Sequence, residues 1–323
     1  MTGTDRLGRI FSCLKFSGKN QTPSGEQPHP EGFLIAVHLH RPTRVRIAIR
    51  DQILSFAGLP LVMGILNVTP DSFSDGGRRL GEHALAERLE AMLVAGVDII
   101  DVGGESTRPF ADPVPVAVEL ARVIPAIEII RRLSPGIPVS IDTSKAVVAR
   151  AALAAGADII NDVSALRFDP DMIRVAVAAN APVILMHMQG TPADMQVAPC
   201  YTDVVTEIMA FLQERICWAE QQGLPRRRIL VDPGLGFGKT EEHNLTILKR
   251  LREFSDLGCP VLVGHSRKGF LGKVLAVPVQ DRDVATAVVS AYCTWQGAHI
   301  LRVHDVLKTV QAVRLIGAIR QAP

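Results

Sequence analysis

The chain has 323 residues, enough for one large domain or two small ones, and 47% of them are apolar, which is ample for a buried core. Its formal net charge of +2 is too small to indicate a nucleic-acid-binding protein. The longest apolar runs are interrupted by Arg, Asp, Asn or His well before the roughly 18 residues that a membrane helix needs. We therefore predict an ordinary soluble globular protein with neither nucleic-acid nor membrane partners.

Residues 1–50 differ from the rest of the chain because they carry eight Lys or Arg against three Asp or Glu. We predict a basic, poorly ordered N-terminal extension, with a targeting or anion-binding arm as the alternative. The first twenty residues lack the apolar segment of a secretory signal, although a transit peptide stays open. Five widely spaced cysteines form no Cys-x-x-Cys pair, which favours reduced thiols, a cytoplasmic location and no structural zinc.

Compact structure is expected over residues 51–323, where short apolar runs alternate with longer amphipathic stretches. The runs are 61–67, 97–103, 138–143, 157–163, 182–188, 228–234, 260–266 and 299–305. They are nearly continuous in Val, Ile and Leu, which is typical of parallel strands covered on both faces. Helical patterns lie between them, and several end on glycine. Eight such units predict an α/β fold, a single-domain (β/α)₈ TIM barrel, with an open doubly wound sheet as the alternative.

Polar side chains gather where the predicted strands end. They are Asn67, Asp101, Asp142, Asn161, Asp162, His187, Asp232, His265, Ser266, Arg267, Lys268, Arg302, His304 and Asp305. In a barrel, the loops that follow the strand C-termini form the active face. Any one of these residues could simply cap the next helix, but their presence after all eight strands predicts a functional site at this end.

The segment VDPGLGFGKTE, residues 231–241, ends like a phosphate-binding P-loop. That motif requires Gly-x-x-x-x-Gly-Lys-Ser/Thr, and Pro233 stands where its first glycine should be. We therefore interpret GLGFGK as a flexible flap that lets the backbone approach a flat ligand and offers the aromatic face of Phe237. A Gly-rich turn with Phe237 packed inward is the alternative.

Phosphate and magnesium are the ligands that the polar residues fit best. The sequence has no His-x-x-x-His pair and no His/Cys cluster, which argues against a tightly bound zinc. An oxygen ligand from Asn67 and an aspartate, completed by substrate phosphates, would suit Mg²⁺. Arg302 and His304, just before a helix that begins near Val306, predict a phosphate site.

Asp142 and Asp232 could accept N–H bonds from a heterocycle with a guanidine-like edge, while Asn161 can both donate and accept. A general acid/base pair of the glycosidase type is the alternative. Barrels of that kind usually use Glu and line their clefts with Trp and Tyr, whereas this chain has two of each aromatic residue, and both Trp fall in helical patterns. The sequence therefore favours a heterocycle over a sugar.

These segments together resemble the dihydropteroate synthases, a family of pterin-binding enzymes. The matching motifs are MGILNVTPDSFSDGG (63–77), DVGGESTRP (101–109), IDTSK (141–145), INDV (160–163), LMHMQG (185–190), DPGLGFGKT (232–240), GHSRKGFLG (264–272) and RVHDV (302–306). The resemblance implies a homodimeric TIM-barrel transferase of folate biosynthesis and a sulfonamide target. Such an enzyme uses Mg²⁺ to join 7,8-dihydropterin-6-ylmethyl diphosphate to 4-aminobenzoate and releases pyrophosphate.

The resemblance also implies roles for individual residues. The pterin ring would be held by Asp142, Asn161, Asp232 and Lys268. The diphosphate would be bound by Asn67, Arg302 and His304, with Mg²⁺ bridging from Asn67. The aminobenzoate pocket would be bordered by Thr107, Arg108, Pro109, Phe237, Ser266 and Lys268, and Arg267 is expected among the substrate-binding residues. A closing loop would bring in Phe73 and Asp75, and Asp75 would stabilise positive charge during the reaction.

One residue departs from the family pattern. Where the family usually has glycine after Thr-Arg-Pro, this chain has Phe110, which predicts a change in loop geometry or in affinity for aminobenzoate and sulfonamides. Two other readings stay open: a non-catalytic pterin-binding paralogue, in which Phe110 obstructs the chemistry, and a methyltetrahydrofolate methyltransferase. The second lacks a reason to carry the NVTPDSFSDGG and STRP loops.

Overall fold

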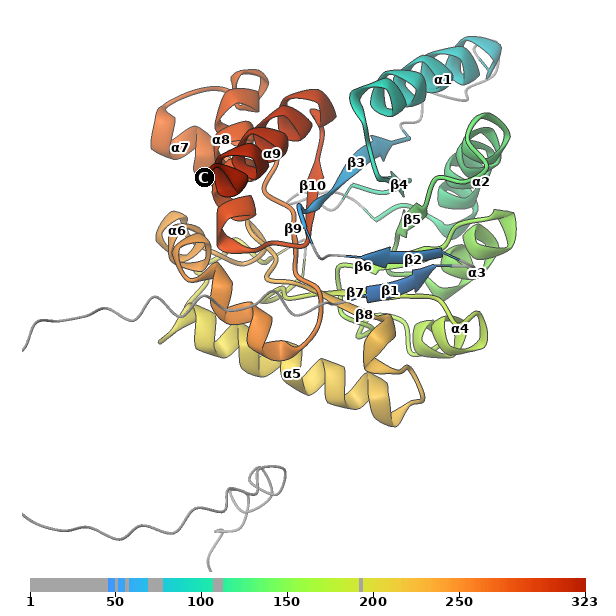
Figure 1. Cartoon of the computed structure of the whole chain (residues 1–323). Helices are drawn as coiled ribbons and strands as arrows, with labels where there is room; N and C mark the ends of the chain where they lie inside the picture. The colour runs from blue at the N-terminus through green and yellow to red at the C-terminus, as the bar shows by residue number, and fades with distance from the viewer. Residues whose placement is uncertain (1–45, 50–51, 56–57, 69–77, 107–112, 192–193) are drawn as a thin grey trace, which may run out of the picture. The chain divides into compact units, whose positions relative to one another are not determined.

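Eight parallel strands form the centre of the fold, in a computed structural model that describes residues 46–49, 52–55, 58–68, 78–106, 113–191 and 194–323 (Figure 1). The strands are β3 (Leu61–Asn67), β4 (Ile99–Gly103), β5 (Val139–Asp142), β6 (Ile159–Asp162), β7 (Val183–Met186), β8 (Ile229–Asp232), β9 (Leu262–Val263) and β10 (Ile300–Val303). Their order is β8-β7-β6-β5-β4-β3-β10-β9, and a parallel bridge between Val231 and Val261 links the two edges. The predicted TIM barrel is confirmed.

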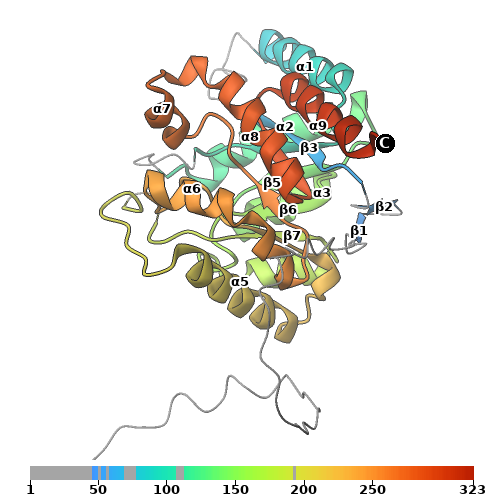
Figure 2. The ribbon, with the colours of Figure 1, turned by 60° about the vertical axis from the view of Figure 1, so that its left-hand side comes forward.

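Helices alternate with the strands along the chain and cover the barrel (Figures 1 and 2). They are α1 (Arg78–Ala95), α2 (Val116–Leu133), α3 (Ala146–Ala155), α4 (Met172–Ala178), α5 (Val204–Gln221), α6 (Glu241–Lys249), α7 (Gly269–Leu275), α8 (Asp283–Gln296) and α9 (Val306–Gln321). Short 3₁₀ segments are η2 (Arg226–Arg228), η3 (Leu251–Leu257) and η4 (Val279–Asp281). Two helices, α7 and α8, lie between β9 and β10, whereas the sequence pattern predicted one helix per unit. In the part of the chain that the structure describes, no helix combines the length and apolar character needed to span a membrane.

The Val- and Ile-rich strands are buried on both faces, as their continuous apolar character predicted. One face packs against the helices in a large apolar cluster that includes Val102, Ile141 and Leu301. The other face fills the barrel with residues near the strand starts, among them Ile99 and Ile300. The core therefore positions the strands by packing on both sides and leaves their C-terminal ends to polar residues.

An antiparallel hairpin, β1 (Arg46–Ile49) and β2 (Gln52–Ser55), precedes the barrel. Its Ile47 and Ile49 are 1% and 3% exposed and pack in the same cluster as the residues near the strand starts. The hairpin therefore covers the end of the barrel opposite the strand C-termini. All described residues belong to one unit, Pro42–Pro323, and the described structure starts at Arg46, within the segment predicted as an extension.

Candidate active site

Three predicted pterin-binding residues lie at the C-terminal ends of strands β5, β6 and β8. Asp142 and Asn161 are partners in the β5–β6 register, and Asp232 is paired with Met186 in the β7–β8 register. Asp142, Asn161 and Asp232 are only 8%, 5% and 6% exposed. Parallel strands in register bring these groups together, which is why residues 90 positions apart in sequence reach one site.

Arg302, on β10, bridges two of the buried carboxylates. Its Nε donates to Asp101 Oδ2 at 2.6 Å, and its second guanidinium nitrogen donates to Asp142 Oδ2 at 2.6 Å. Burial alone lowers the pKa of Arg302, but Asp101 and Asp142 outweigh it and raise the pKa above its usual value. The guanidinium is therefore a fixed cation in the centre of the site.

Asp142 is poised to receive a ligand donor. Its Oδ1 is buried and has no hydrogen-bond partner among the described residues. Burial raises the pKa of Asp142 to about 7, against the opposing effect of Arg302 and with a further rise from Asp101. A buried carboxylate oxygen without a partner is costly, so this atom identifies the place where an N–H donor of a ligand would bind.

Asp232 and Lys268 form the neighbouring part of the site. Asp232 Oδ1 accepts the backbone N–H of Gly234 at 2.7 Å, and burial raises the pKa of Asp232 while Lys268 lowers it. Lys268 stands directly before α7, with its Nζ 4.0 Å from the centre of the Phe237 ring. A carboxylate, an ammonium and an aromatic face are therefore adjacent, which suits a flat, polar heterocycle.

Ser266 and His304 are brought together at the ends of β9 and β10. The Ser266 hydroxyl accepts the backbone N–H of His304 at 3.1 Å and lies 3.0 Å from His304 Nδ1. The Arg267 guanidinium, by contrast, forms a bidentate pair with Asp283 at the start of α8, at 2.6 and 2.9 Å. In the described structure Arg267 is thus engaged by a helix, while Ser266 holds His304.

Asn67 is exposed at the end of β3, beside Asp142. A Cβ placed on Gly103 would lie 3.6 Å from Asn67 Oδ1 and 3.9 Å from Asp142 Oδ2, so the glycine leaves space between these oxygens. Among the described residues, no group of three or more His, Cys, Asp or Glu could hold a metal ion. The Asn67 oxygen therefore fits a hard cation such as Mg²⁺ only if other ligands, such as phosphate and water, complete its shell, because Asp142 Oδ2 already accepts from Arg302.

The glycines of the loop after β8 have a different structural role from the one predicted. Gly234 and Gly238 both have positive φ, and a Cβ on either would collide with the backbone of the loop that follows β7, at His187 and Gln189. Phe237 is 8% exposed and packs with methionines of the neighbouring strands and loop. The glycines thus permit close packing of two loops, and the alternative of a Gly-rich turn with Phe237 packed inward describes it better than a flexible flap.

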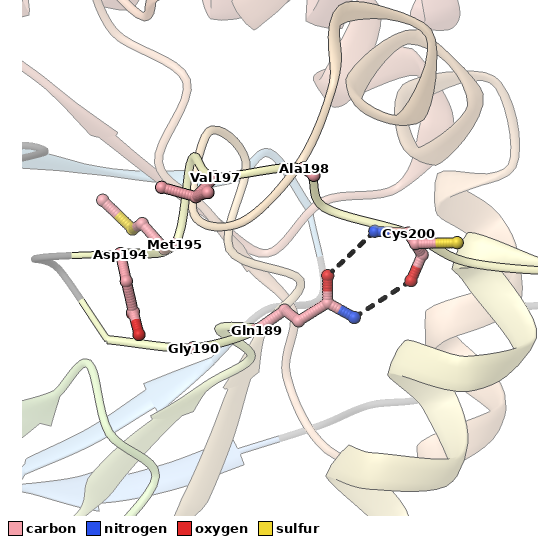
Figure 3. A pocket seen from close by; sticks show the side chains of 7 residues that line it. All are labelled: Gln189, Gly190, Asp194, Met195, Val197, Ala198 and Cys200. Carbon is pink, nitrogen blue, oxygen red and sulfur yellow. Dashed lines mark hydrogen bonds between the residues drawn. The ribbon is translucent and has the colours of Figure 1, made fainter.

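The loop after β7 forms a small pocket beside these elements (Figure 3). Its lining residues are Gln189, Gly190, Asp194, Met195, Val197, Ala198 and Cys200. The Gln189 side chain bonds the backbone of Cys200 in both directions, at 3.0 and 3.1 Å, which braces the loop. No predicted site residue in the described ranges lines this pocket, so it is separate from the carboxylate cluster.

Several predicted residues lie outside the described part of the chain: Phe73, Asp75, Thr107, Arg108 and Pro109, together with the unusual Phe110. Conversely, the sequence predicts no specific role for Asp101, although its polar side chain is among those where the predicted strands end. Asp101 is fully buried and holds Arg302, and the Asn161 amide nitrogen lies 3.5 Å from both of its oxygens. No local sequence signal marks Asp101 as the partner of Arg302, because the two residues meet only across the closed barrel.

Comparison with known proteins gives a consistent family. A family model described as "Pterin binding enzyme" matches residues 63–304. The dihydropteroate synthase of Escherichia coli is 47% identical over 259 residues, which cover 80% of this chain and 91% of that protein. A probable bifunctional folylpolyglutamate synthase/dihydropteroate synthase of Haloferax volcanii is 51% identical over the same share of this chain, but the chain spans only 30% of its length.

A solved structure supports the same family. The dihydropteroate synthase of Xanthomonas albilineans, determined with 4-aminobenzoic acid, has a TM-score of 0.80 and 44% identity, with 87% of this chain and all of that chain covered. The likeness in fold therefore extends over the barrel and is accompanied by high sequence identity. On these matches, the chain belongs to the pterin-binding enzymes and, within them, to the dihydropteroate synthase family.

Proposed function

We propose that the chain condenses 7,8-dihydropterin-6-ylmethyl diphosphate with 4-aminobenzoate to give 7,8-dihydropteroate and pyrophosphate. The observation that carries this proposal is the buried Oδ1 of Asp142, which has no partner among the described residues, in a site shared with Asn161, Asp232 and Lys268. The family supports it, because its relatives carry this activity in their names and a related structure was determined with 4-aminobenzoic acid.

The pterin ring is proposed to bind across Asp142, Asn161 and Asp232. The guanidine-like edge of a pterin presents N–H donors, which match the acceptor oxygens of the two carboxylates. Asn161 can donate and accept, so it can pair with a ring nitrogen or with the ring carbonyl. Hydrogen bonds to ionised groups are the strong ones, which gives the pterin a well-defined orientation in the barrel.

The diphosphate is proposed to face Arg302 and His304. When the bond between the pterin methylene carbon and the diphosphate oxygen breaks, its electron pair leaves with the diphosphate, and a cation next to that oxygen stabilises the developing charge. The nitrogen of 4-aminobenzoate then attacks the methylene carbon and loses one proton. Arylamines are unprotonated at neutral pH, so the attacking lone pair is available without a strong base.

Magnesium is proposed to join the diphosphate near Asn67, where it would neutralise part of the phosphate charge. The supporting observation is the exposed Asn67 side chain at the end of β3, whose oxygen lies beside the space at Gly103. This chain offers few ligands of its own there, which matches the preference of Mg²⁺ for phosphate and water.

The 4-aminobenzoate is proposed to lie on the Phe237 side of the site, with Lys268 and Ser266. Phe73, Asp75, Thr107, Arg108 and Pro109 remain proposed members of the site from the family resemblance. Exclusion of water would matter here, because water could also trap the electrophilic methylene carbon.

We further propose that the chain works as a homodimer. Helix α8 presents exposed apolar side chains with helical spacing, namely Val284, Val288, Tyr292 and Trp295, which are 68%, 65%, 41% and 47% exposed. The neighbouring helix α9 adds Leu315 and Ile319 (Figure 1). Exposed apolar surfaces of this kind commonly mark protein–protein interfaces.

A cytoplasmic location is proposed from the thiol chemistry. Cys200, Cys217, Cys259 and Cys293 are all free. Free thiols persist in reducing compartments, and the exposed Cys200 and Cys217 would be vulnerable elsewhere. Imaging of the tagged full chain in its own cell tests the location, and a signal outside the cytoplasm would contradict it.

Product formation tests the function. The purified protein is mixed with both substrates and Mg²⁺, and 7,8-dihydropteroate is followed by chromatography and mass detection. Asp232→Asn should reduce the rate by about 100-fold, since it removes a charged acceptor from the pterin site. Asp171→Asn, which changes an exposed carboxylate that pairs with Arg174 on the outer helix α4, serves as the control and should leave the rate unchanged. Absence of product with the unmodified protein would refute the function.

A further inference from the structure

The P-loop-like segment contains a lysine, Lys239, to which the proposed chemistry gives no role. Its side chain is 3% exposed, so it does not face solvent as a phosphate-binding lysine would. The next residue, Thr240, caps helix α6 by accepting the backbone N–H of His243 at 3.2 Å. Both residues of the Lys-Thr pair thus have internal partners in this fold.

Lys239 Nζ meets three acceptors. It lies 2.8 Å from the Phe237 carbonyl oxygen, 3.0 Å from His187 Nδ1 and 3.4 Å from the His187 carbonyl oxygen. The three N–H donors of a protonated Lys239 would match these three acceptors. Burial, and then the nearby Lys239 cation, lowers the pKa of His187 to about 2, which keeps the imidazole neutral and its Nδ1 an acceptor.

The loop around Phe237 is tied at three consecutive carbonyl groups. The donors are Gln196 Nε2 to Gly236 at 2.6 Å, Lys239 Nζ to Phe237 at 2.8 Å, and the Tyr201 hydroxyl to Gly238 at 2.8 Å. Of these three bonds, only the one from Lys239 ends on Phe237, whose own N–H donates to the Gly234 carbonyl at 3.1 Å. It is also the only one of the three made by a buried donor, so its loss would remove a buried hydrogen bond. Burial lowers the pKa of Lys239 well below its usual value.

Phe237 in turn sets the place of Lys268. Its ring lies 4.0 Å from Lys268 Nζ, and a Cβ on Gly236 would lie 3.1 Å from Lys268 Cδ, so the Lys268 side chain runs along this loop. A displacement of the Phe237 backbone would therefore move the aromatic face and the ammonium together. Together with Ser266, these are the described groups that flank the proposed 4-aminobenzoate position.

We propose that Lys239 is a positioning residue, which holds the Phe237 carbonyl so that the Phe237 ring and the Lys268 ammonium form one wall of the 4-aminobenzoate site. This inference rests on the proposed function and deepens it. In this proposal Lys239 acts through its bond to the Phe237 carbonyl and does not contact the phosphate of the substrate. Its loss should weaken the use of 4-aminobenzoate much more than the use of the pterin substrate.

The test is the steady-state kinetics of Lys239→Met. We expect the KM for 4-aminobenzoate to rise about 10-fold, which corresponds to the loss of one buried hydrogen bond. The KM for the pterin diphosphate should rise less, within about 3-fold, and kcat should also stay within about 3-fold, because Asp142, Asn161 and Asp232 hold the pterin in addition to Lys268. Lys249→Met, an exposed lysine at the end of α6, is the matched control and should change none of these values.

A double-mutant cycle with Phe237→Ala separates positioning from a general structural effect. If Lys239 acts through Phe237, Lys239→Met should change the 4-aminobenzoate KM less than about 2-fold in the Phe237→Ala background. The same 10-fold rise in both backgrounds would overturn the inference, as would an equal rise in both KM values. An active unmodified protein with no effect of Lys239→Met would refute only this inference, whereas an inactive one would refute the proposed function and this inference with it.

Protein folding is followed by thermal unfolding of each variant. Should Lys239→Met not fold, Lys239→Gln, which is neutral but polar, takes its place in the same cycle. Failure of both variants to fold would make Lys239 a residue required for folding and would also overturn the positioning role.

Discussion

Asp142 combines three properties that rarely occur in one side chain. It is buried, it is paired with Arg302 through Oδ2, and its Oδ1 has no partner among the described residues. Burial raises its pKa to about 7, so a change of pH near neutrality changes its charge. The group is therefore expected to accept ligand N–H bonds most strongly when it is ionised.

The affinity for a dihydropterin should depend on pH through this residue. Below pH 7 Asp142 takes up a proton and can no longer accept two N–H bonds, so we expect the dissociation constant to fall as the pH rises from 6 to 8. Calorimetric titration with a dihydropterin that lacks the diphosphate measures it. Asp142→Asn should bind about 10- to 100-fold more weakly and lose this part of the pH dependence. An identical pH profile in both proteins would contradict the assignment.

The pairing of Asp101, Arg302 and Asp142 could not be predicted from the sequence. The two bonds join residues that are 201 and 160 positions apart, and only the closure of the barrel brings them together. By contrast, the strand-end positions of Asp142, Asn161 and Asp232 followed from local patterns. The chemistry of single residues was therefore predictable where it depends on one strand and was missed where it depends on pairing across the barrel.

At the scale of elements, a buried ion cluster joins three segments near the strand ends. Lys145 Nζ donates to Glu105 at 2.8 Å and to the fully buried Glu119 of α2 at 2.6 Å. Glu105 also accepts the backbone N–H of Val114 at 2.7 Å, which ties residue 105 to residue 114. The cluster thus links α2, the loop before α3 and both sides of residues 106–113.

Lys145→Met should lower the free energy of unfolding by about 3 kcal/mol, because it leaves the buried Glu119 without its cation. The double variant Lys145→Met/Glu119→Gln should recover most of this loss. Chemical denaturation measures both values, with Lys249→Met as a control that should stay within about 0.5 kcal/mol. If the single and double variants are equally unstable, the loss of stability does not come from leaving the Glu119 carboxylate without its cation.

The hairpin β1–β2 is expected to stabilise the fold without taking part in substrate binding or catalysis. Ile47→Ala should lower the free energy of unfolding by about 2 to 4 kcal/mol, because it opens a cavity in the layer at the strand starts. The KM values should not change, since that layer lies at the opposite end of the barrel from the site. Ile53→Ala, in the same hairpin but 61% exposed, is the control. Equal effects of the two variants would contradict the packing role of the hairpin.

The sequence predicted the barrel strands well and the hairpin not at all. The continuous Val, Ile and Leu runs identified all eight strands, because burial on both faces leaves a strong local signal. The hairpin, however, is four residues on each side and lies partly in the basic segment, so its burial depends on contacts with the barrel. Short elements of this kind are decided by tertiary packing.

At the scale of the whole molecule, the proposed dimer places α8 at an interface. Val288→Glu should convert the dimer to a monomer, because it inserts a charge into an apolar contact. Size-exclusion chromatography with light scattering measures the mass. Val94→Glu, which changes an 89% exposed valine on α1, should leave the mass unchanged. If the unmodified protein is monomeric, the homodimer is refuted. If Val288→Glu still forms a dimer, the interface lies elsewhere than on this part of α8.

Synthesis of dihydropteroate at the strand C-termini is tested most directly by pyrophosphate release with and without 4-aminobenzoate. The purified protein is given the dihydropterin diphosphate and Mg²⁺, beside Asp142→Asn and Lys268→Ala. Release that requires 4-aminobenzoate, and that falls about 100-fold or more in both variants, is the expected result. Pterin binding without release in the unmodified protein would contradict a synthase and would indicate a non-catalytic pterin-binding protein.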